Sequence, residues 1–197
     1  MIEYFESIDQ AIVLMINGWN TSFWDEVMWI VSAKVTWLPL YLCLAFLAFK
    51  QGGSKIGIVF ILGAIAAVGL SDLISAQLFK DLIQRYRPSH NLLLTDQLHF
   101  YQIDSENCYK GGQYGFVSSH AANFFAICTF SLLYLKSFER WLRPLLIFTA
   151  LLVSYSRLYL GVHYLSDVVV GGLLGVLVAY TVYRFLFLTI VKKIEAQ

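Results

Sequence analysis

The sequence predicts an all-α membrane protein, a polytopic bundle of five transmembrane helices with a further amphipathic helix at the N-terminus, six helices in all. Of its 197 residues, 58% are hydrophobic and only 14% are charged, whereas about a quarter of the residues in a soluble domain are charged. The mean hydropathy is +0.65. The apolar residues also gather in five stretches close to the roughly 20 residues that a helix needs to cross a bilayer.

Residues 1–19 are predicted to form the amphipathic helix, lying along the membrane surface. Apolar residues recur at helical spacing at Ile2, Phe5, Ile8, Ile12 and Ile16, which places them on one face. The uninterrupted apolar run in this segment reads only AIVLMI. That run is too short to span a membrane, so the helix is expected to rest at the interface.

The five apolar stretches that follow are predicted to cross the membrane. They run over residues 27–49, 56–79, 121–135, 144–156 and 168–191. Pro144 is placed in the first turn of the fourth helix, where a proline is tolerated. Gly171 and Gly175 in the fifth helix would let a neighbouring helix approach closely.

The chain is expected to form one membrane-embedded domain over residues 1–197, with its transmembrane core at 27–191, because no repeat or linker divides it. Residues 88–115 form the longest connection between apolar stretches, longer than is usual in a helical bundle. Its length and its aromatic residues suggest a lid or an entrance wall.

The basic residues indicate an orientation in the membrane. Seven of them flank the apolar stretches on one side: Lys50, Lys55, Lys136, Arg140, Arg143, Lys192 and Lys193. Cytoplasmic loops are enriched in Lys and Arg, so this side is predicted to be cytoplasmic. The connection at 88–115 would then lie on the opposite, extracytoplasmic side of the membrane.

Two ionisable residues near the second apolar stretch are expected to have structural roles. Asp72, inside the stretch, is predicted to contact a polar group on another helix. Arg85, beyond its end, is predicted to reach lipid headgroups by extending along the helix end.

A histidine and an aspartate stand in the stretch SRLYLGVHYLSD, residues 156–167. His163 and Asp167 are four residues apart at the predicted start of the last helix, so they would share one face. The carboxylate could then accept a hydrogen bond from one imidazole nitrogen and leave the other unprotonated. Arg157 adds a planar set of donors that suits phosphate oxygens.

Two basic residues lie at the outer end of the second apolar stretch. Lys80 and Arg87 are seven residues apart, which is about two helical turns. Both are therefore predicted to project from one face of the helix before Pro88 ends it.

Three polar residues, Ser118, Ser119 and His120, open the third apolar stretch. The free N–H groups and the dipole at a helix N-terminus favour an anion there. Together with the cations on the same side of the membrane, they predict a phosphate site that contains two histidines.

These stretches resemble the three-part signature of the phosphatidic acid phosphatase type 2 superfamily, in its integral-membrane bacterial lipid phosphatase branch. The first part, K-x6-R-P, stands at residues 80–88, and the third, S-R-x5-H-x3-D, stands at 156–167. The second part usually reads P-S-G-H, and here it reads V-S-S-H at 117–120. The helix layout of the whole chain is similar to that family as well.

The resemblance implies a phosphatase that works through a phosphohistidine. His163 would be the nucleophile, Asp167 would orient it, and His120 would act as general acid and then as general base. The phosphate-binding residues would be Lys80, Arg87, Ser118, Ser119 and Arg157. No metal and no cofactor is implied, because cations hold the phosphate and the acidic residues are too scattered for a two-metal cluster.

The resemblance also implies a place and a class of substrate. The protein would be a multi-pass protein of the bacterial cytoplasmic (inner) membrane, with its active site facing the periplasm. It would remove a terminal phosphate from a lipid phosphate or a polyprenyl pyrophosphate, such as undecaprenyl pyrophosphate, phosphatidylglycerol phosphate, phosphatidic acid or a lipid A phosphate. Membrane lipids are the expected partners; no protein partner is evident, and the singly placed Lys and Arg residues give no sign of a nucleic-acid partner.

Two alternatives to hydrolysis stay open. A phosphotransferase would use the same phosphohistidine and pass the phosphoryl group to a sugar or a lipid acceptor. A membrane anion-binding or transport protein is suggested by intramembrane polar residues such as Asp72 and Asn123.

Overall fold

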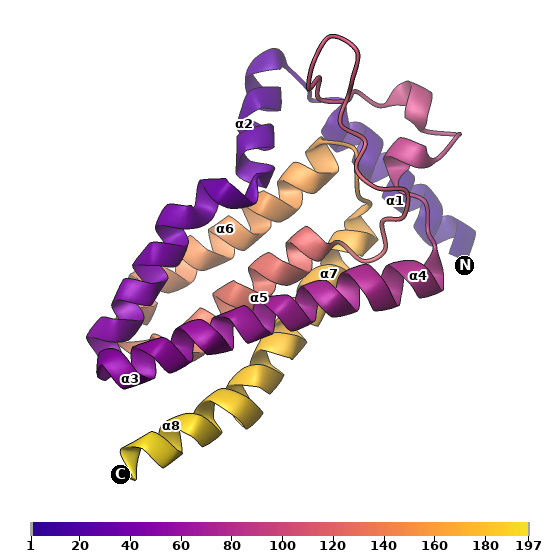
Figure 1. Cartoon of the computed structure of the whole chain (residues 1–197). Helices are drawn as coiled ribbons and strands as arrows, with labels where there is room; N and C mark the ends of the chain where they lie inside the picture. Colours follow the sequence, from indigo (N-terminus) through magenta and orange to yellow (C-terminus); the bar gives the residue numbers. More distant parts are fainter. Residues whose placement is uncertain (1, 197) are drawn as a thin grey trace.

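The computed structural model describes residues 2–196, and within this range the chain forms helices and loops without an extended strand (Figure 1). The helices are α1 (Ile2–Asn17), α2 (Ser22–Ser32), α3 (Leu38–Leu73), α4 (Lys80–Ile83), α5 (Ser119–Tyr134), α6 (Glu139–Tyr159), α7 (Leu165–Thr181) and α8 (Leu188–Glu195). The π-helical turns Ile74–Phe79 and Val182–Phe187 make α3 continuous with α4 and α7 continuous with α8. The all-α prediction is confirmed.

Helix α1 is the predicted N-terminal amphipathic helix. Val13 and Ile16 are buried, whereas Phe5 and Met15 are exposed apolar side chains. The buried face packs against α6 and α7, because one apolar stripe of an amphipathic helix must be covered. The place of α1 at the membrane interface stays a prediction.

The prediction that the first membrane helix starts at residue 27 is wrong. Helix α2 ends at Ser32, Ala33 is extended, and a 3₁₀ turn at Lys34–Trp37 leads into α3 at Leu38. Pro39 lies at the beginning of α3, where the missing N–H of a proline costs no hydrogen bond.

Helix α3 reverses direction at Gly53. This residue has φ 70° and ψ −174°, a left-handed region that only glycine enters readily. The reversal gives α3 two arms, residues 38–52 and 54–73, that run in opposite directions (Figure 1). The predicted connection between the first two apolar stretches falls at this turn.

Two helical segments are long and apolar enough to cross a membrane. One is Lys34–Ile83, whose 50 residues include the reversal at Gly53, and the other is Leu165–Glu195, with 31 residues. Ser119–Tyr134 and Lys136–Tyr159 pass the same test only together, with a bend of 95° between them. Five crossings therefore stay a prediction. Pro144 lies inside α6 rather than in its first turn, because α6 already begins at Glu139.

Helices α5 and α7 pack closely, which brings their N-termini together. A Cβ atom added to Gly171 or Gly175 would collide with the backbone of α5, so the close approach predicted for these glycines is confirmed. At the top of this contact the Ser118 backbone N–H donates to the Asp167 carbonyl oxygen at 3.0 Å. The second and third motifs are thereby held side by side.

The connection at 88–115 packs onto the bundle. Leu94, Leu98 and Phe100 are buried in a cluster with Val13 of α1. Two of its tyrosines pack against Trp29 of α2: the Tyr101 ring stacks on it at 4.6 Å, and the Tyr109 ring meets it edge-on at 5.0 Å. The connection therefore forms a wall between α1 and α2, and its role as a lid stays a prediction.

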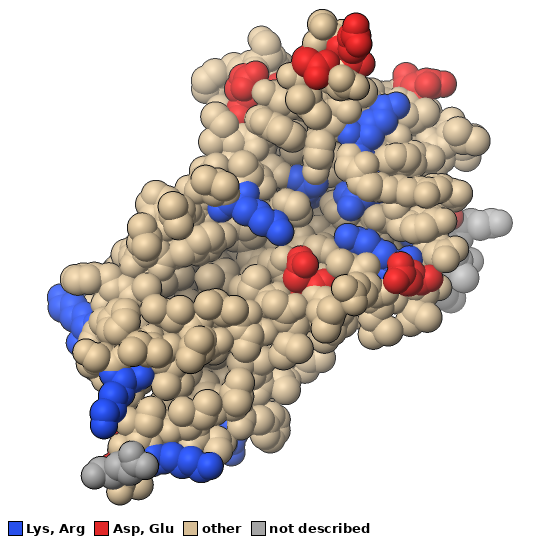
Figure 2. Space-filling view, in the orientation of Figure 1, with Lys and Arg blue, Asp and Glu red and all other residues tan. Residues whose placement is uncertain are grey.

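The basic side chains form two groups. In Figure 2, Lys and Arg gather at the lower left end, where Figure 1 places the turn of α3 and the end of α8. They gather again around the hollow in the middle of the molecule. This distribution follows the two groups expected from the sequence, and the cytoplasmic orientation of the first group stays a prediction.

Candidate active site

His163 lies in the short loop between α6 and α7, just before the N-cap residue Tyr164. The prediction that it shares a helix face with Asp167 is wrong, because α7 begins only at Leu165. The two side chains nevertheless meet. Asp167 is the third residue of α7, and its Oδ2 atom accepts from the Tyr164 backbone N–H at 3.0 Å and lies 3.3 Å from His163 Nδ1.

The neighbours of His163 determine its tautomer. Arg87 Nη1 lies 2.9 Å from His163 Nε2, and a guanidinium can only donate. Nε2 must therefore be the acceptor, so the ring proton is on Nδ1, where it faces Asp167. Burial lowers the pKa of His163 well below its usual range, and the charges of Arg87, Arg157 and Lys80 lower it further. The ring is neutral, with the lone pair of Nε2 directed at the cations.

Arg87 reaches this position from a loop. Helix α4 ends at Ile83, because Gln84 adopts a left-handed conformation with φ 47°. The predictions that Lys80 and Arg87 share a helix face and that Pro88 ends the helix are therefore wrong. The Arg87 side chain is buried and also donates to the carbonyl oxygens of Tyr114 and Val162, each at 3.1 Å. Burial, followed by the charge of Arg157, lowers the pKa of Arg87 to about 10, so it stays charged near neutral pH.

The predicted helix start at Ser118 is confirmed. Ser118 is the N-cap of α5, and its Oγ accepts from the Ala121 backbone N–H. Ser119, which stands where the family pattern has glycine, accepts hydrogen bonds through Oγ from Lys80 Nζ at 3.1 Å and from Ser75 Oγ at 2.9 Å. The unusual serine thus fixes the position of Lys80 beside the N-terminus of α5.

Arg157 stands at the end of α6 with 2% of its surface exposed. Its Nη2 donates to the Tyr109 hydroxyl at 2.7 Å, and its Nη1 donates to Ser32. Its Nε is buried without a hydrogen-bond partner. Such an unused donor in a buried group calls for an explanation, and a bound anion would supply one.

The cations at this site lack acidic partners. Among the described residues, no carboxylate lies within ion-pair distance of Lys80, Arg87 or Arg157. Burying a charge is costly unless an opposite charge compensates it. Two buried guanidinium groups around one neutral imidazole therefore form an anion site.

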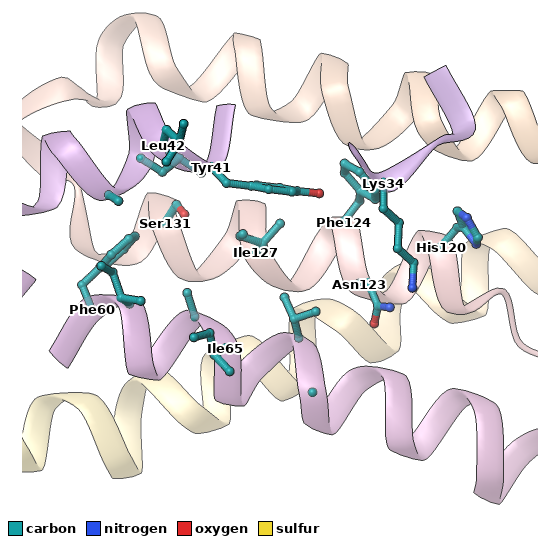
Figure 3. A pocket seen from close by; sticks show the side chains of 16 residues that line it. Lys34, Tyr41, Leu42, Phe60, Ile65, His120, Asn123, Phe124, Ile127 and Ser131 are labelled. Carbon is teal, nitrogen blue, oxygen red and sulfur yellow. The ribbon is translucent and has the colours of Figure 1, made fainter. Parts of the chain in front are cut away.

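His120 lies in the first turn of α5 and within electrostatic range of Arg157 and His163. On its other side a cavity of about 610 Å³ extends between the two arms of α3 and α5 (Figure 3). The cavity is lined mainly by apolar side chains, and its polar end carries Lys34, His120 and Asn123. Asn123 Nδ2 donates to Asp72 Oδ1 at 2.7 Å, so the predicted interhelical contact of Asp72 is confirmed.

The structure adds a residue that the sequence pattern assigned to lipid headgroups. Arg85 donates from Nη1 to Asp167 Oδ1 at 2.9 Å and from Nη2 to Asp9 Oδ2 at 2.8 Å. The headgroup prediction is wrong, because the side chain points into the bundle. No local signal could have shown this, since the contact depends on how α1 crosses α7. The contact of Tyr109 with Arg157 was missed as well, because the long connection at 88–115 brings these two residues together.

Comparisons with known proteins show the family to which the chain belongs. The model of the PAP2 superfamily matches residues 57–190, which include all three motifs. A lipid A 4'-phosphatase of Bacteroides thetaiotaomicron is 31% identical over 89% of this chain and 75% of its own length. An undecaprenyl-diphosphatase of Sulfolobus acidocaldarius is 30% identical over 98% of this chain and 82% of its own.

A solved structure is similar over nearly the whole chain. The crystal structure of a transmembrane PAP2-type phosphatidylglycerolphosphate phosphatase from Bacillus subtilis aligns with a TM-score of 0.64 and 26% identity. The alignment covers 92% of this chain and 86% of that one. The chain therefore belongs to the PAP2 superfamily and stands among its membrane phosphatases.

Proposed function

We propose that this membrane phosphatase hydrolyses the terminal phosphate of a lipid phosphate or polyprenyl pyrophosphate through a phosphohistidine on His163, without a metal ion. The arrangement around His163 supports this most directly. Its Nε2 carries the lone pair, and it lies among cations that lack acidic partners. A phosphate oxygen that takes over the Arg87 donor leaves the Nε2 lone pair free to attack phosphorus.

The first step transfers the phosphoryl group to the enzyme. Nε2 of His163 forms a bond to phosphorus while the bond from phosphorus to the lipid oxygen breaks. His120, which must take up a proton when the negatively charged substrate binds, gives that proton to this oxygen as general acid. The phosphorylated ring keeps its proton on Nδ1 and becomes positive, and Asp167 stabilises this charge.

The second step releases phosphate. His120, now neutral, takes a proton from a water molecule, whose oxygen attacks phosphorus while the bond to Nε2 breaks. His163 returns to its neutral form. In both steps Lys80, Arg87 and Arg157, with Ser118 and Ser119, neutralise the charge on the phosphoryl oxygens, which is the main task in phosphoryl transfer.

The cavity beside His120 supports a lipid as the leaving group. The proton that His120 donates goes to the oxygen that joins phosphorus to the rest of the substrate, so that part of the substrate must lie next to His120. An apolar cavity of about 610 Å³ begins there, and it suits an acyl or prenyl chain. The names of the two curated relatives make a lipid A phosphate and undecaprenyl diphosphate the first candidates.

The site is proposed to face the periplasmic side of a bacterial inner membrane. The seven cations counted on the other side support this orientation, because Lys and Arg favour the cytoplasm. The connection at 88–115, which borders the site through Tyr109 and Arg157, would then be reached from the periplasm.

Gly69→Phe is expected to impair long-chain substrates selectively. Gly69 lines the cavity, and a Cβ atom there meets no atom within 4 Å, so a phenyl ring can occupy the space of the lipid chain. For a long-chain lipid phosphate, kcat/KM should fall by about tenfold or more, whereas hydrolysis of water-soluble p-nitrophenyl phosphate should change little.

The neighbouring residue offers a matched control for this test. Leu70 is exposed and does not line the cavity, so Leu70→Phe should leave both substrates unaffected. An equal loss on both substrates in Gly69→Phe, or no loss on either, would count against the cavity as the lipid site.

Phosphate release by the purified protein tests the proposed function. The four candidate lipids named from the sequence would be offered in detergent micelles, with and without EDTA, and with and without a sugar or lipid acceptor. Hydrolysis predicts free phosphate from at least one lipid, unaffected by EDTA and independent of the acceptor. Phosphate that moves to an acceptor identifies a phosphotransferase, and inhibition by EDTA contradicts the metal-free mechanism.

A further inference from the structure

Two buried carboxylates from opposite ends of the sequence share one guanidinium group. Asp167 is fully buried and Asp9 is 6% exposed. Arg85 bridges them, with Nη1 at 2.9 Å from Asp167 Oδ1 and Nη2 at 2.8 Å from Asp9 Oδ2. Arg85 Nη1 also donates to Ser166 Oγ at 2.7 Å. The carboxylate that faces His163 is thus compensated by a cation that lies outside the phosphate-binding set.

Asp9 also holds the N-terminus of α7. Its Oδ1 accepts from the Ser166 backbone N–H at 3.0 Å, and its Oδ2 accepts from the Ser166 hydroxyl. The first N–H groups of a helix lack partners within the helix, so Asp9 of α1 serves as a cap supplied by a distant segment. Helix α1 is thereby fixed to the turn of α7 that carries Asp167.

The Arg85 side chain is held from a third direction by an aromatic ring. Its guanidinium lies 4.1 Å from the ring centre of Tyr164, which is the N-cap residue of α7 and the neighbour of His163. A cation over an aromatic face is attracted by the ring. Arg85 therefore contacts both the residue before Asp167 and the residue after His163.

We propose that Arg85 and Asp9 are positioning residues for His163, so that α1 forms part of the apparatus that supports phosphoryl transfer. The inference rests on the proposed function. Asp167 must point one oxygen at Nδ1 and stay negative while the phosphorylated ring is positive. Arg85 fixes its other oxygen and compensates its charge, and Asp9 fixes Arg85 and the start of α7.

This arrangement predicts that loss of Arg85 affects kcat and leaves KM nearly unchanged. The donors of Arg85 are used by Asp167, Asp9 and Ser166, so its loss leaves the phosphate-binding cations in place. The nucleophile, by contrast, becomes less well oriented, and a small misplacement can cost about a hundredfold in rate. Removal of Arg85 should therefore lower kcat by about 10- to 100-fold and change KM by less than about twofold.

Arg85 can be reached from the surface, which permits chemical rescue. It lines a second cavity of about 570 Å³ together with Glu6, His90 and Tyr164. Its side chain is 23% exposed. A small cation from solution can therefore enter the space that the side chain leaves in Arg85→Ala.

The test measures p-nitrophenyl phosphate hydrolysis by Arg85→Ala with and without guanidinium, at concentrations too low to unfold the protein. We expect guanidinium to restore at least a fifth of the lost kcat, because it replaces the bridge between Asp167 and Asp9. Arg85→Lys, which keeps the charge and loses the double bridge, should be intermediate. In Arg140→Ala, which removes an exposed arginine far from the site, guanidinium should change nothing.

Asp9→Asn gives the second measurement and does not depend on Arg85→Ala being folded. Its kcat should fall by a smaller factor at unchanged KM, and the double variant with Arg85→Ala should lose no more than Arg85→Ala alone, since the two residues act in series. Wild-type kcat in Arg85→Lys and Asp9→Asn would overturn the inference. So would a folded Arg85→Ala protein whose lost activity guanidinium does not restore.

His163→Ala, purified and assayed in the same way, distinguishes a failure of the positioning inference from a failure of the proposed function. If this variant is inactive and the Arg85 and Asp9 variants are unimpaired, only the positioning inference fails. If His163→Ala keeps its activity, the proposed function itself fails.

Discussion

His163→Ala is expected to abolish turnover of lipid phosphate. The variant removes the Nε2 atom that would bond to phosphorus, while Arg87, Arg157 and Lys80 can still hold the phosphate. Loss of a nucleophile of this kind costs at least about 10³-fold in kcat. Substrate binding should survive, because the cations that provide it are intact. The measurement is phosphate release by the purified variant, beside a binding measurement with a non-hydrolysable lipid phosphonate.

His90→Ala is the matched control for this variant. His90 lies on the same side of the protein, and Ser89 is the only hydrogen-bond partner of its imidazole among the described residues. Its removal should leave kcat within about twofold, because its imidazole makes no hydrogen bond to a residue of the phosphate site. A His163→Ala protein that kept more than a tenth of the activity would contradict the nucleophilic role. It would fit a membrane anion-binding or transport protein better, since such a protein needs no nucleophile.

His120→Gln is expected to have the second-largest effect, and the effect should depend on the leaving group. A lipid alkoxide leaves poorly without a proton, so kcat on the lipid should fall by about 10²- to 10⁴-fold. p-Nitrophenolate leaves without help, so the first step on p-nitrophenyl phosphate should stay fast. The second step still needs a base to activate water and should be slow.

These two rates predict a burst of p-nitrophenol in stopped-flow absorbance, close to one equivalent per enzyme, followed by a slow steady state. The burst separates the two roles assigned to His120, since it requires a fast first step and a slow second one. Equal losses on both substrates without a burst would show that His120 acts in binding or folding only.

Several helices could be predicted from the sequence because they rest on local patterns. The apolar stripe of residues 1–19 gave α1, and the polar triplet at Ser118 gave the start of α5. The glycines at 171 and 175 indicated the close contact of α7 with α5. The start of the first apolar stretch at residue 27 was wrong because hydrophobicity continues through a backbone break at Ala33, which a pattern of apolar residues cannot register.

The motifs predicted which residues gather at the candidate site, but they did not predict which helices and loops carry those residues. The three motifs named His163, Asp167, His120 and the cations, and hydrogen bonds join three pairs of motif residues: Arg87 with His163, Lys80 with Ser119 and Ser118 with Asp167. The spacing arguments placed two other pairs, His163 with Asp167 and Lys80 with Arg87, on helix faces. The structure instead brings Arg87 and His163 from loops, because Gln84 ends one helix early and Tyr164 delays the next.

Arg85 shows what a linear reading leaves out. It stands two residues before Arg87 and looks like any cation at a membrane helix end. Its partners, Asp9 and Asp167, are 76 and 82 residues away in the chain. Only the crossing of α1 over α7 makes the three into one unit.

Detection of a phosphorylated His163 tests the central claim most directly. His120→Gln protein would be mixed with p-nitrophenyl phosphate radiolabelled in its phosphate, quenched in alkali and mapped by mass spectrometry. We predict label on the peptide that contains His163, stable in alkali, lost in acid and absent when His163→Ala is added to the same variant. Label on any other residue, or a fully active wild-type enzyme that forms no phosphorylated protein on the timescale of turnover, would contradict the account.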